Sequence, residues 1–518
     1  MTGDRAMTIG AGLDAVRTPR PIAPDEAIHV LGIAGAGASG AALLAAAAGA
    51  TVSGCDPGGE SPYSAALSAS GVPVAATHDA QHVTAADPTP TRLAVTKALT
   101  AIDPDQAELR AARVAGIPVE PWQQVVADAA HGRTLVGVAG THGKSTTAGW
   151  LVHVVAAAGH DPGAFVGALL PATISGGVPA TSRFGAGSAF IVEADEYAGN
   201  FDAYRPAIAA LTSIEWDHPD VFADRAAVIE AFRGWVTAMG QGWPSAGPAI
   251  PPGGRQPILV ANVGDPGVAA LVAALPRGLV ETRPYVLLEG DDPAPSGASL
   301  SGRILESAPR FTRIEISGLP GVTRPVIVAL PTAGRHNAAN ALAVAGAASA
   351  LGLDVASIAA GLESFPGVGR RLERKGEARS VAVYDDYGHH PTAIVETIRA
   401  VRQREPGRRV WAVYEPLTYH RTAALHEAFA DALANADAVA VAQIWAGRDL
   451  DTSVDTAEAL AASVANRRNG LTAVAPGDVE ETAAWLSGEV RPGDVVLVMG
   501  GGRSYRIGEL LLEALEGD

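Results

Sequence analysis

The segment that most constrains the fold is a glycine-rich turn between an apolar strand and a helix. Residues 134–140, TLVGVAG, have the pattern of a buried strand, and an amphipathic helix is expected from Ser145. The sequence between them is Gly140-Thr-His-Gly143. Backbone N–H groups of such a loop and of the helix N-terminus form a positive cradle for phosphate oxygens. The chain is therefore predicted to contain a phosphate-binding strand–loop–helix unit.

Two side chains give this loop its expected chemistry. Lys144 is expected to reach the β- and γ-phosphates of a nucleotide, and the Ser145 hydroxyl to ligate Mg²⁺. The spacing is shorter than the common G-x-x-x-x-G-K-[ST] pattern, and the alternative is a glycine-rich turn with an incidental Lys-Ser pair. The order of strand, loop, lysine, hydroxyl and helix favours the nucleotide site. Its predicted residues are Gly140, Thr141, His142, Gly143, Lys144, Ser145 and Thr146.

Polar side chains follow two further apolar strands. Residues 192–197, VEADEY, place three carboxylates within four residues, which repel each other unless a cation lies among them. Hard oxygen ligands at a strand end beside a phosphate loop suit Mg²⁺. Asp217 and His218 follow the strand predicted at 207–214, and His218 is either a metal ligand or a proton acceptor. The alternatives are a solvated acidic loop and a capping histidine.

A second glycine-rich turn lies near the N-terminus. Residues 28–56 run strand, turn, Ala-rich helix and strand, and end on Asp56. Gly35, Gly37 and Gly40 fit G-x-G-x-x-G, a pattern in which a phosphate or pyrophosphate approaches the backbone at a helix N-terminus. Strands and helices alternate along the whole chain, which favours parallel sheets covered by helices.

Length and charge limit the possible functions. A chain of 518 residues suggests about three domains. The net charge of −17 makes a nucleic-acid-coating or membrane-surface protein a poor candidate. The single cysteine, Cys55, excludes an internal disulfide and a cysteine-rich metal site. We see no secretory signal and no apolar stretch long enough to span a bilayer, so a soluble cytoplasmic protein is expected.

Several weaker polar motifs lie in the second half of the chain. Residues 336–340 offer a histidine and two asparagines near a helix start, where one helix face could bind a base or ribose edge or simply cap the helix. Residues 384–391 and 414–422 are polar strand ends that could bind a ribose, a carboxylate or an amine, or form plain loops. Arg370 and Arg371 could reach a phosphate across a cleft or be surface charge.

Taken in order, GTHGKST, VEADEY, Asp217-His218, HNAANALA, GVGRR and DDYGHHPT resemble the Mur ligase family of peptidoglycan synthesis over residues 28–510. The resemblance implies an α/β protein of three domains: a Rossmann-like domain that binds a UDP-sugar, a P-loop ATPase-like domain with a parallel sheet, and a second Rossmann-like domain that binds an amino acid. We expect a flexible tail over 1–25 and these domains over 26–122, 123–366 and 367–518. The boundaries near 122 and 366 follow composition and pattern only.

The resemblance also implies a reaction. ATP and Mg²⁺ would activate the lactyl carboxylate of UDP-N-acetylmuramate as an acyl phosphate, and L-alanine would capture it as an amide; a monomer or homodimer would act on these small molecules. The implied catalytic residues are Lys144, Glu193, His218 and Arg370, with Ser145, Glu193 and His218 holding metal. The implied adenosine contacts are His336, Asn337, Asn340 and Asp386. The UDP-sugar contacts are Gly35, Ala36, Gly37, Ser39 and Asp56, and the amino-acid contacts are Tyr387, His389 and Arg421.

Some positions depart from the family pattern. Ser145 replaces a threonine, Thr96-Lys97 replaces Ser-Ser, and Leu417-Thr418 replace a histidine and an arginine that would serve the amino-acid end. The acceptor could therefore be the recycled murein tripeptide. An NAD-dependent dehydrogenase, a P-loop kinase or ATPase switch, and a non-catalytic regulator are further alternatives. The dehydrogenase leaves Lys144, Glu193 and His218 without a role.

Overall fold

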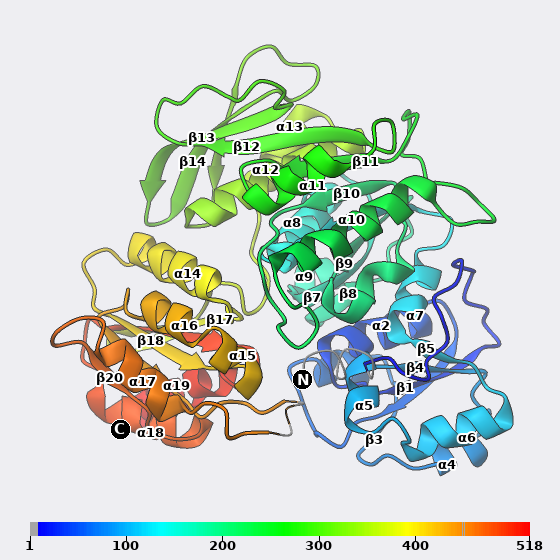
Figure 1. Ribbon diagram of the computed structural model, residues 1–518, viewed down its shortest axis with the longest axis horizontal. Helices are drawn as coiled ribbons and strands as arrows, with labels where there is room; N and C mark the ends of the chain where they lie inside the picture. The colour runs from blue at the N-terminus through cyan, green and yellow to red at the C-terminus, as the bar shows by residue number, and fades with distance from the viewer. Residues whose placement is uncertain (1–8, 448, 450, 518) are drawn as a thin grey trace.

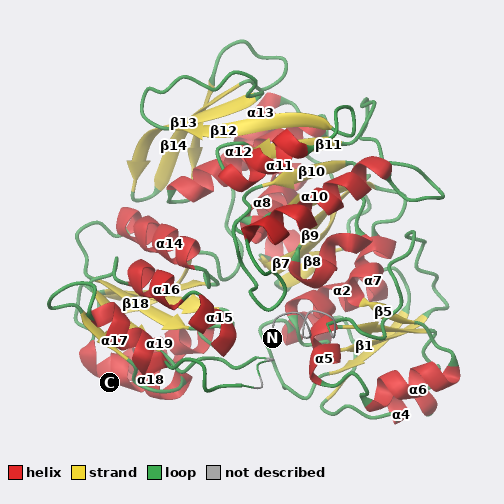
Figure 2. Ribbon diagram, viewed as in Figure 1, coloured by secondary structure: helices red, strands yellow, loops and turns green. Residues whose placement is uncertain are grey.

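A computed structural model describes residues 9–447, 449 and 451–517, and its elements form three α/β units along the chain (Figure 1). Each unit is built on one sheet, and helices pack against the sheets (Figure 2). This arrangement confirms the predicted fold class.

The first unit has a five-stranded parallel sheet in the order β3-β2-β1-β4-β5. The strands are β1 (Ala27–Leu31), β2 (Thr51–Cys55), β3 (Val74–Ala75), β4 (Arg92–Val95) and β5 (Val119–Pro121). The helices are α2 (Ala36–Ala47), α3 (Ser64–Ala69), α4 (Gln81–Thr84), α5 (Lys97–Ile102), α6 (Ala107–Ala115) and α7 (Trp122–Ala129).

The segment before β1 is bound to this unit. The Arg17 guanidinium lies 2.7 Å from Glu120 Oε1 and 2.8 Å from Asp128 Oδ2, and both carboxylates are buried. The Asp14 backbone N–H donates to the carbonyl of Val119 at 2.7 Å. The expectation of a flexible tail over 1–25 is therefore not met for residues 9–25, because their arginine meets buried carboxylates of β5 and α7. Residues 1–8 lie outside the described part of the chain.

The second unit has a ten-stranded sheet in the order β15-β14-β13-β12-β11-β10-β6-β9-β7-β8. The sheet expected to be parallel is parallel from β13 to β7, and antiparallel pairs add β8 at one edge and β14 and β15 at the other. The strands are β6 (Thr134–Ala139), β7 (Gly163–Leu170), β8 (Ala180–Arg183), β9 (Ala189–Ala194), β10 (Ile208–Leu211), β11 (Ile258–Asn262), β12 (Glu281–Leu288), β13 (Leu300–Ala308), β14 (Phe311–Ser317) and β15 (Val326–Leu330).

Two helices of the second unit pack against the helix that follows the phosphate loop. Helix α8 (Lys144–Ala157) packs against α12 (Arg335–Ala350) and α13 (Val355–Glu363). The contact is close, because a Cβ on Gly361 would come within 2.8 Å of the Val154 Cα. The remaining helices are α9 (Ala172–Ser175), the 3₁₀ segment η1 (Tyr197–Ala203), α10 (Arg225–Gln241) and α11 (Pro266–Ala274). The Pro/Gly-rich segment after α10, up to residue 257, connects this helix to β11.

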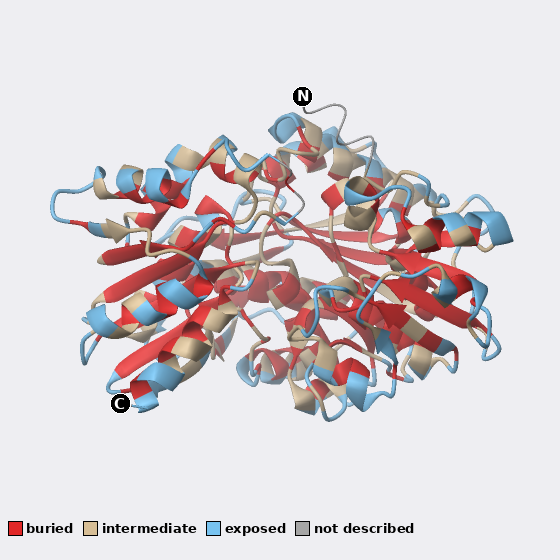
Figure 3. Ribbon diagram, turned by 90° about the horizontal axis from the view of Figure 1, so that it is seen from below, coloured by how far each residue is buried: buried red, intermediate tan, exposed pale blue. Residues whose placement is uncertain are grey.

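The third unit has a six-stranded sheet in the order β16-β17-β21-β18-β19-β20, parallel except for β16. Figure 3 shows the strands buried and the outer faces of many helices exposed. The strands are β16 (Glu373–Ala378), β17 (Val381–Asp386), β18 (Val410–Glu415), β19 (Ala438–Val441), β20 (Thr472–Val474) and β21 (Val495–Gly500). The helices are α14 (Pro391–Arg404), α15 (Tyr419–Ala424), α16 (His426–Leu433), α17 (Ala457–Ala465), α18 (Val479–Glu489) and α19 (Tyr505–Gly517).

Among the described residues, none of the helices combines the length and the apolar character that crossing a bilayer requires.

Candidate active site

A cavity of about 1300 Å³ lies where the three units meet. Its walls come from the loop before α8, the ends of β9 and β10, the start of α12, the α2 and α7 termini, and the strand ends of the third unit. The predicted site residues that line it are Gly37, Thr141, His142, Gly143, Lys144, Ser145, Thr146, Glu193, His218, His336, Asn337, Asn340, Arg370, Asp386, Tyr387, His389 and Arg421. The predicted residues outside its lining are Gly35, Ala36, Ser39, Asp56 and Gly140.

The glycines of the phosphate loop are required by its backbone. Gly140 has φ 138° and Gly143 has φ 80°, in the region that side chains with a Cβ rarely adopt. A Cβ on Gly140 would lie 2.2 Å from Thr212 Oγ1, and one on Gly143 would lie 2.5 Å from Asn340 Oδ1. The loop is thus packed against β10 and α12, and this packing aims the α8 N-terminus into the cavity.

Lys144 lies among acidic groups at the floor of the cavity. Its Nζ is 2.8 Å from Glu196 Oε2 and 3.5 Å from Asp195 Oδ1. Burial alone lowers the pKa of Lys144, but the Glu196 and Asp195 carboxylates outweigh it and raise the pKa above its usual range. The side chain therefore carries a fixed positive charge where phosphate oxygens would enter.

Ser145 connects the loop to a second strand and to the third unit. Its Oγ donates to Glu193 Oε1 at 2.9 Å, and it accepts from Arg371 Nη2 at 2.8 Å. The other Glu193 oxygen accepts from the Gly167 backbone N–H at 2.6 Å. The hydroxyl and the carboxylate are adjacent oxygens facing the cavity, which is a donor set that Mg²⁺ prefers.

A second group of possible metal ligands lies beside Lys144. Asp195, Glu196 and His218 each place a ligand atom within 4.8 Å of the others. His218 has φ 55°, a backbone conformation uncommon for a residue with a side chain, and its ring meets the Tyr197 ring at 4.8 Å. The negative charges of Asp195 and Glu196 lie close together and repel each other. The positive charge of Lys144 offsets part of this repulsion. Two oxygen-rich positions therefore flank the loop, and their donors fit a hard divalent cation.

The arginine that reaches the phosphate loop is Arg371, not Arg370. Arg370 is buried in the third unit, with Nε 3.0 Å from Asp385 Oδ2 and Nη2 2.8 Å from the Gly500 carbonyl oxygen. The left-handed φ of 57° at Arg370 turns the chain, so the two neighbouring side chains point in different directions. The expectation for Arg370 is corrected in this respect: its guanidinium is bound within its own unit.

Arg421 crosses from the third unit to the second. Its Nη2 lies 2.6 Å from Asp217 Oδ1, and both side chains are buried. Burial raises the pKa of Asp217, but the Arg421 guanidinium reverses this and holds the pKa well below its usual range. The two residues form a buried ion pair at the wall of the cavity.

His390 makes a second contact between these units. Its Nε2 donates to the Trp216 carbonyl at 3.2 Å, and its Nδ1 accepts from the Thr392 backbone N–H at 3.3 Å, which caps α14. Burial and the nearby His142 lower the pKa of His390 to about 4. The neutral ring is therefore the form that fits both bonds.

This contact predicts a pH dependence of stability. Because the folded pKa is lower than the ordinary value of 6.5, the unfolded chain binds a proton that the folded chain excludes. The stabilisation is complete above about pH 6.5 and falls as the pH approaches 4, by about 3 kcal/mol in all. Urea unfolding of the wild type and of His390→Asn between pH 7 and 4 measures it. We expect a shallower slope in His390→Asn and an unchanged slope in the exposed control His160→Ala; equal slopes in the wild type and His390→Asn contradict the assignment.

The other predicted adenosine-binding residues of the second and third units are held in place by hydrogen bonds or charged neighbours. Asn340 Nδ2 donates to Asn337 Oδ1 at 3.2 Å, and His336 Nδ1 is 3.7 Å from Glu396 of α14. Both Asp386 oxygens accept backbone N–H groups at 2.7 Å, from Leu372 and Gly388.

Tyr387 and His389 form one aromatic wall of the cavity. The Tyr387 ring lies 5.1 Å from the guanidinium carbons of Arg370 and Arg371 and 5.1 Å from the His389 ring. His389 Nδ1 lies 2.8 Å from the Tyr387 carbonyl. Burial lowers the pKa of His389 well below its usual range, so this wall carries no imidazolium charge.

The glycines of the N-terminal glycine-rich turn allow close packing as well as a change of chain direction. A Cβ on Gly37 would lie 2.2 Å from the Trp122 ring, and one on Gly40 would lie 2.7 Å from Thr181 Oγ1 in the second unit. Asp56 accepts from the Ala34 backbone N–H at 3.1 Å and thereby closes the turn. The fingerprint glycines therefore let α2 approach its neighbours closely, which the pattern alone did not indicate.

The sequence did not predict one contact between the first and second units. Lys97 Nζ donates to the carbonyls of Ala198 and Gly199 at 2.8 and 2.9 Å, which ties α5 of the first unit to η1 of the second. The only signal was that Thr96-Lys97 departs from the family pattern. In the third unit, His420 is not part of the cavity wall and lies 3.1 Å from Asp449 Oδ2, whereas Leu417 and Thr418 line the cavity.

Three family descriptions match successive parts of the chain. The one described as Mur ligase family, catalytic domain, matches residues 27–134; the Mur ligase middle domain matches 138–348; and the Mur ligase, glutamate ligase domain, matches 370–502. Two curated relatives, named UDP-N-acetylmuramate–L-alanine ligase, come from Roseiflexus sp. (strain RS-1) and Frankia casuarinae. Each is 34% identical over 94% of this chain, and the matches cover 98% and 97% of those proteins.

Solved structures have the same arrangement of units. The UDP-N-acetylmuramate-alanine ligase of Thermotoga maritima matches with a TM-score of 0.74 and 21% identity over 95% of this chain and 99% of that one. A murein peptide ligase of Psychrobacter arcticus matches with a TM-score of 0.68 and 22% identity over the same shares. At these identities the structures support the fold.

Proposed function

Because this chain belongs to the Mur ligase family, we propose that it is an ATP-dependent ligase that joins L-alanine to the lactyl carboxylate of UDP-N-acetylmuramate. The observation that carries the proposal is the single cavity in which Lys144, Glu193 and His218 meet Arg421 of the third unit. The names of the full-length relatives at 34–36% identity support L-alanine as the amine.

The geometry suits a two-step reaction. A carboxylate is a poor electrophile, so its oxygen first attacks the γ-phosphorus of ATP in line, and an acyl phosphate and ADP form. The amine of the amino acid then attacks the acyl carbon, and phosphate leaves. The acyl phosphate hydrolyses readily, so the third unit must exclude water while it exists. The Arg421–Asp217 and His390–Trp216 contacts are suited to holding that unit closed.

The residues take the following proposed roles in phosphoryl transfer. Lys144 neutralises the β- and γ-phosphate charge beside the backbone N–H groups of the loop. Bound Mg²⁺ would add positive charge at the phosphates; Ser145 with Glu193 and His218 with its acidic neighbours would hold it. Arg371, rather than Arg370, faces the phosphates. The adenosine would lie against His336, Asn337, Asn340 and Asp386.

The three units divide the substrates among them. We assign the UDP-sugar to the first unit, within 26–122, with Gly35, Ala36, Gly37, Ser39 and Asp56 forming or supporting its pyrophosphate turn. ATP belongs to 123–366 and the amino acid to 367–518, where Tyr387 and His389 shape the pocket and Arg421 binds the carboxylate. In this assignment, Arg421 exchanges its bond to Asp217 for one to the substrate, or shares both.

Phosphate release tests the proposal. The full chain is incubated with UDP-N-acetylmuramate, ATP and Mg²⁺ and with each of a panel of amino acids or the murein tripeptide, and products are identified by mass. We expect phosphate and an amide product with L-alanine. The tripeptide is the second candidate, since Leu417 and Thr418, which replace a histidine and an arginine of the family pattern, line the pocket. Product with the tripeptide alone would transfer the assignment to that acceptor, and nucleotide hydrolysis without any amide would refute a ligase.

A further inference from the structure

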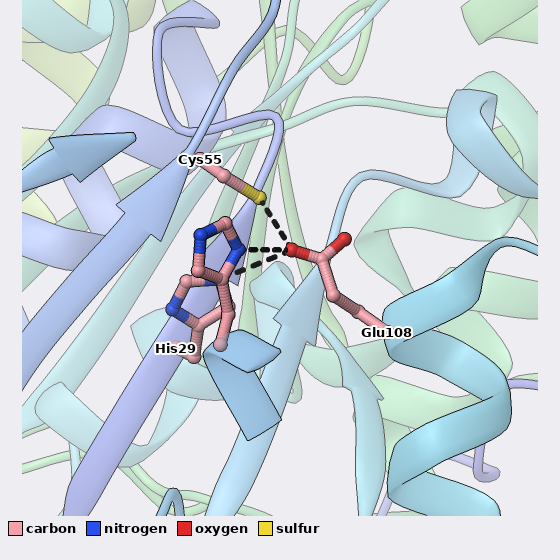
Figure 4. Close-up of side chains that lie close together, drawn as sticks. His29, Cys55 and Glu108 are labelled. Carbon is pink, nitrogen blue, oxygen red and sulfur yellow. Dashed lines mark hydrogen bonds and ion pairs between the residues drawn. The ribbon is translucent and has the colours of Figure 1, made fainter. Parts of the chain in front are cut away.

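A further cluster of metal-ligand side chains lies in the first unit, apart from the cavity. It consists of His29 on β1, Cys55 at the end of β2, His82 on α4 and Glu108 on α6. One ligand atom from each lies within 4.8 Å of the others, and none of the four lines the cavity. Figure 4 shows His29 and Cys55 directed at one carboxylate oxygen of Glu108.

The donors converge on Glu108 Oε1. His82 Nδ1 lies 2.6 Å from it, Cys55 Sγ lies 3.1 Å from it, and His29 Nε2 lies 3.6 Å from it. The His29 ring is 3% exposed, and its Nε2 has no hydrogen-bond partner. Its other nitrogen, Nδ1, lies 2.8 Å from Ser53 Oγ, and this bond directs Nε2 into the cluster. A buried ring nitrogen without a hydrogen-bond partner thus points at a thiol, a carboxylate and a second imidazole.

We propose that His29, Cys55, His82 and Glu108 bind a borderline divalent cation, and that Zn²⁺ is its occupant. Thiolate and imidazole donors select such a metal over Mg²⁺ or Ca²⁺, and four protein ligands are the number found in structural zinc sites. On binding, the Cys55 thiol releases its proton to solvent. Thiolate and carboxylate together then balance the two positive charges of the ion.

The distances require only a small rearrangement. Donors that share one Zn²⁺ stand about 3.3–3.8 Å apart, given bonds of about 2.0–2.3 Å in a tetrahedron. The 3.6 Å separation of His29 Nε2 from Glu108 Oε1 already fits, whereas the 2.6 Å and 3.1 Å separations are those of hydrogen bonds. The Glu108 oxygen would therefore have to withdraw from His82 and Cys55 to admit the ion.

Neighbouring groups are placed to hold the ligands from outside. His78 Nδ1 lies 3.2 Å from the second Glu108 oxygen, and the Gln106 amide donates to the same oxygen. Ser53 orients His29, as described above. Outer groups of this kind fix ligand orientation in metal sites.

The proposed ion would stabilise a part of the first unit that has only a small apolar core. Helix α4 spans only Gln81–Thr84, and the apolar cluster on this side of the sheet is small: Leu31, Cys55, Val83, Leu93, Val95, Leu109, Ala112 and Val119. An ion would join α4 and α6 to β1 and β2. The Cys55 carbonyl also accepts from the Gly32 backbone N–H at 2.9 Å, so the ion would lie directly behind the glycine-rich turn. This role is structural and does not depend on the proposed ligase activity.

Cobalt spectroscopy tests the site directly. Metal-free full-length chain, without nucleotide, is titrated with Co²⁺, and thiolate-to-cobalt absorption is recorded. Because Cys55 is the single cysteine of the chain, any such absorption reports this cluster. We expect one equivalent of Co²⁺ to produce it and Zn²⁺ to remove it. Cys55→Ser should lack it, His82→Ala should bind at least tenfold more weakly, and the exposed control His160→Ala should match the wild type.

Thermal unfolding supplies the second readout. We expect Zn²⁺ to raise the midpoint of the wild type by several degrees and to leave that of Cys55→Ser unchanged. Absence of thiolate–cobalt absorption in the wild type, or equal Zn²⁺ shifts in the two proteins, would overturn the proposal and leave a hydrogen-bonded cluster. If Cys55→Ser does not fold, His82→Ala decides, because the His82 side chain is partly exposed. Neither the cobalt absorption nor the unfolding midpoint depends on amide formation.

Discussion

The Lys144→Met substitution is expected to lower kcat for amide formation by about 10³-fold. Methionine keeps the approximate length of the side chain and removes its charge. We propose that the ammonium of Lys144 is the positive group of the loop that faces the incoming phosphates, and Glu196 and Asp195 hold it charged and in place. Phosphate release and product mass at saturating substrates measure the loss.

In this experiment, a loss of folding stability must be distinguished from a loss of catalytic rate. Removing one partner of a buried ion pair costs about 3–5 kcal/mol, because the other charge is left without compensation. Lys144→Arg keeps the charge and serves as the matched variant; it is expected to fold like the wild type and still to be impaired, since the larger head group does not fit the loop. A folded Lys144→Met protein with kcat within tenfold of the wild type would show that the lysine does not carry the transfer step.

The sequence predicted the fold well where the signals are local. The strand at 134–140 and the helix after it were located correctly because apolar runs, glycines and a helix start follow one another without interruption. Parallel strands bring their carboxyl ends to one edge of the sheet, so the loop, VEADEY and Asp217-His218 were expected to meet. The structure places Lys144, Glu193 and His218 around one cavity, as that expectation required.

Predictions that depended on the direction of one side chain were weaker. Arg370 and Arg371 are adjacent, and only the left-handed turn at Arg370 determines that Arg371 faces Ser145. Likewise, Gly37 and Gly40 matched a nucleotide fingerprint, while their closest neighbours are Trp122 and Thr181 from other parts of the chain. Sequence spacing carries no information about contacts of that range.

The cluster around Cys55 shows the same limit. Its ligands come from two strands and two helices, at positions 29, 55, 82 and 108, and no short metal-binding motif joins them. A single cysteine was sufficient to exclude a cysteine-rich site from the sequence. A mixed site with one thiolate becomes visible only when the sheet brings β1 and β2 together under α4 and α6.

Arg421→Lys is expected to raise the KM for L-alanine by about 10- to 100-fold and to leave the KM for ATP within about threefold. A guanidinium can bind a carboxylate with two parallel hydrogen bonds, whereas an ammonium offers a single point charge. The side chain is positioned for this by its 2.6 Å ion pair with Asp217, which a lysine retains only in part. Steady-state kinetics with each substrate varied in turn give the two values.

The control lies on the outer surface of the same unit. Arg467 pairs there with Glu427 and Asp431, so Arg467→Lys makes the same chemical change away from the cavity and should leave both KM values unchanged. A separate effect on closure would also be visible, because weaker docking of the third unit exposes the acyl phosphate to water and raises phosphate release above amide formation. Equal increases in the two KM values, with phosphate and amide still formed one to one, would place Arg421 outside the amino-acid pocket, since a carboxylate-binding group must affect the substrate that carries the carboxylate.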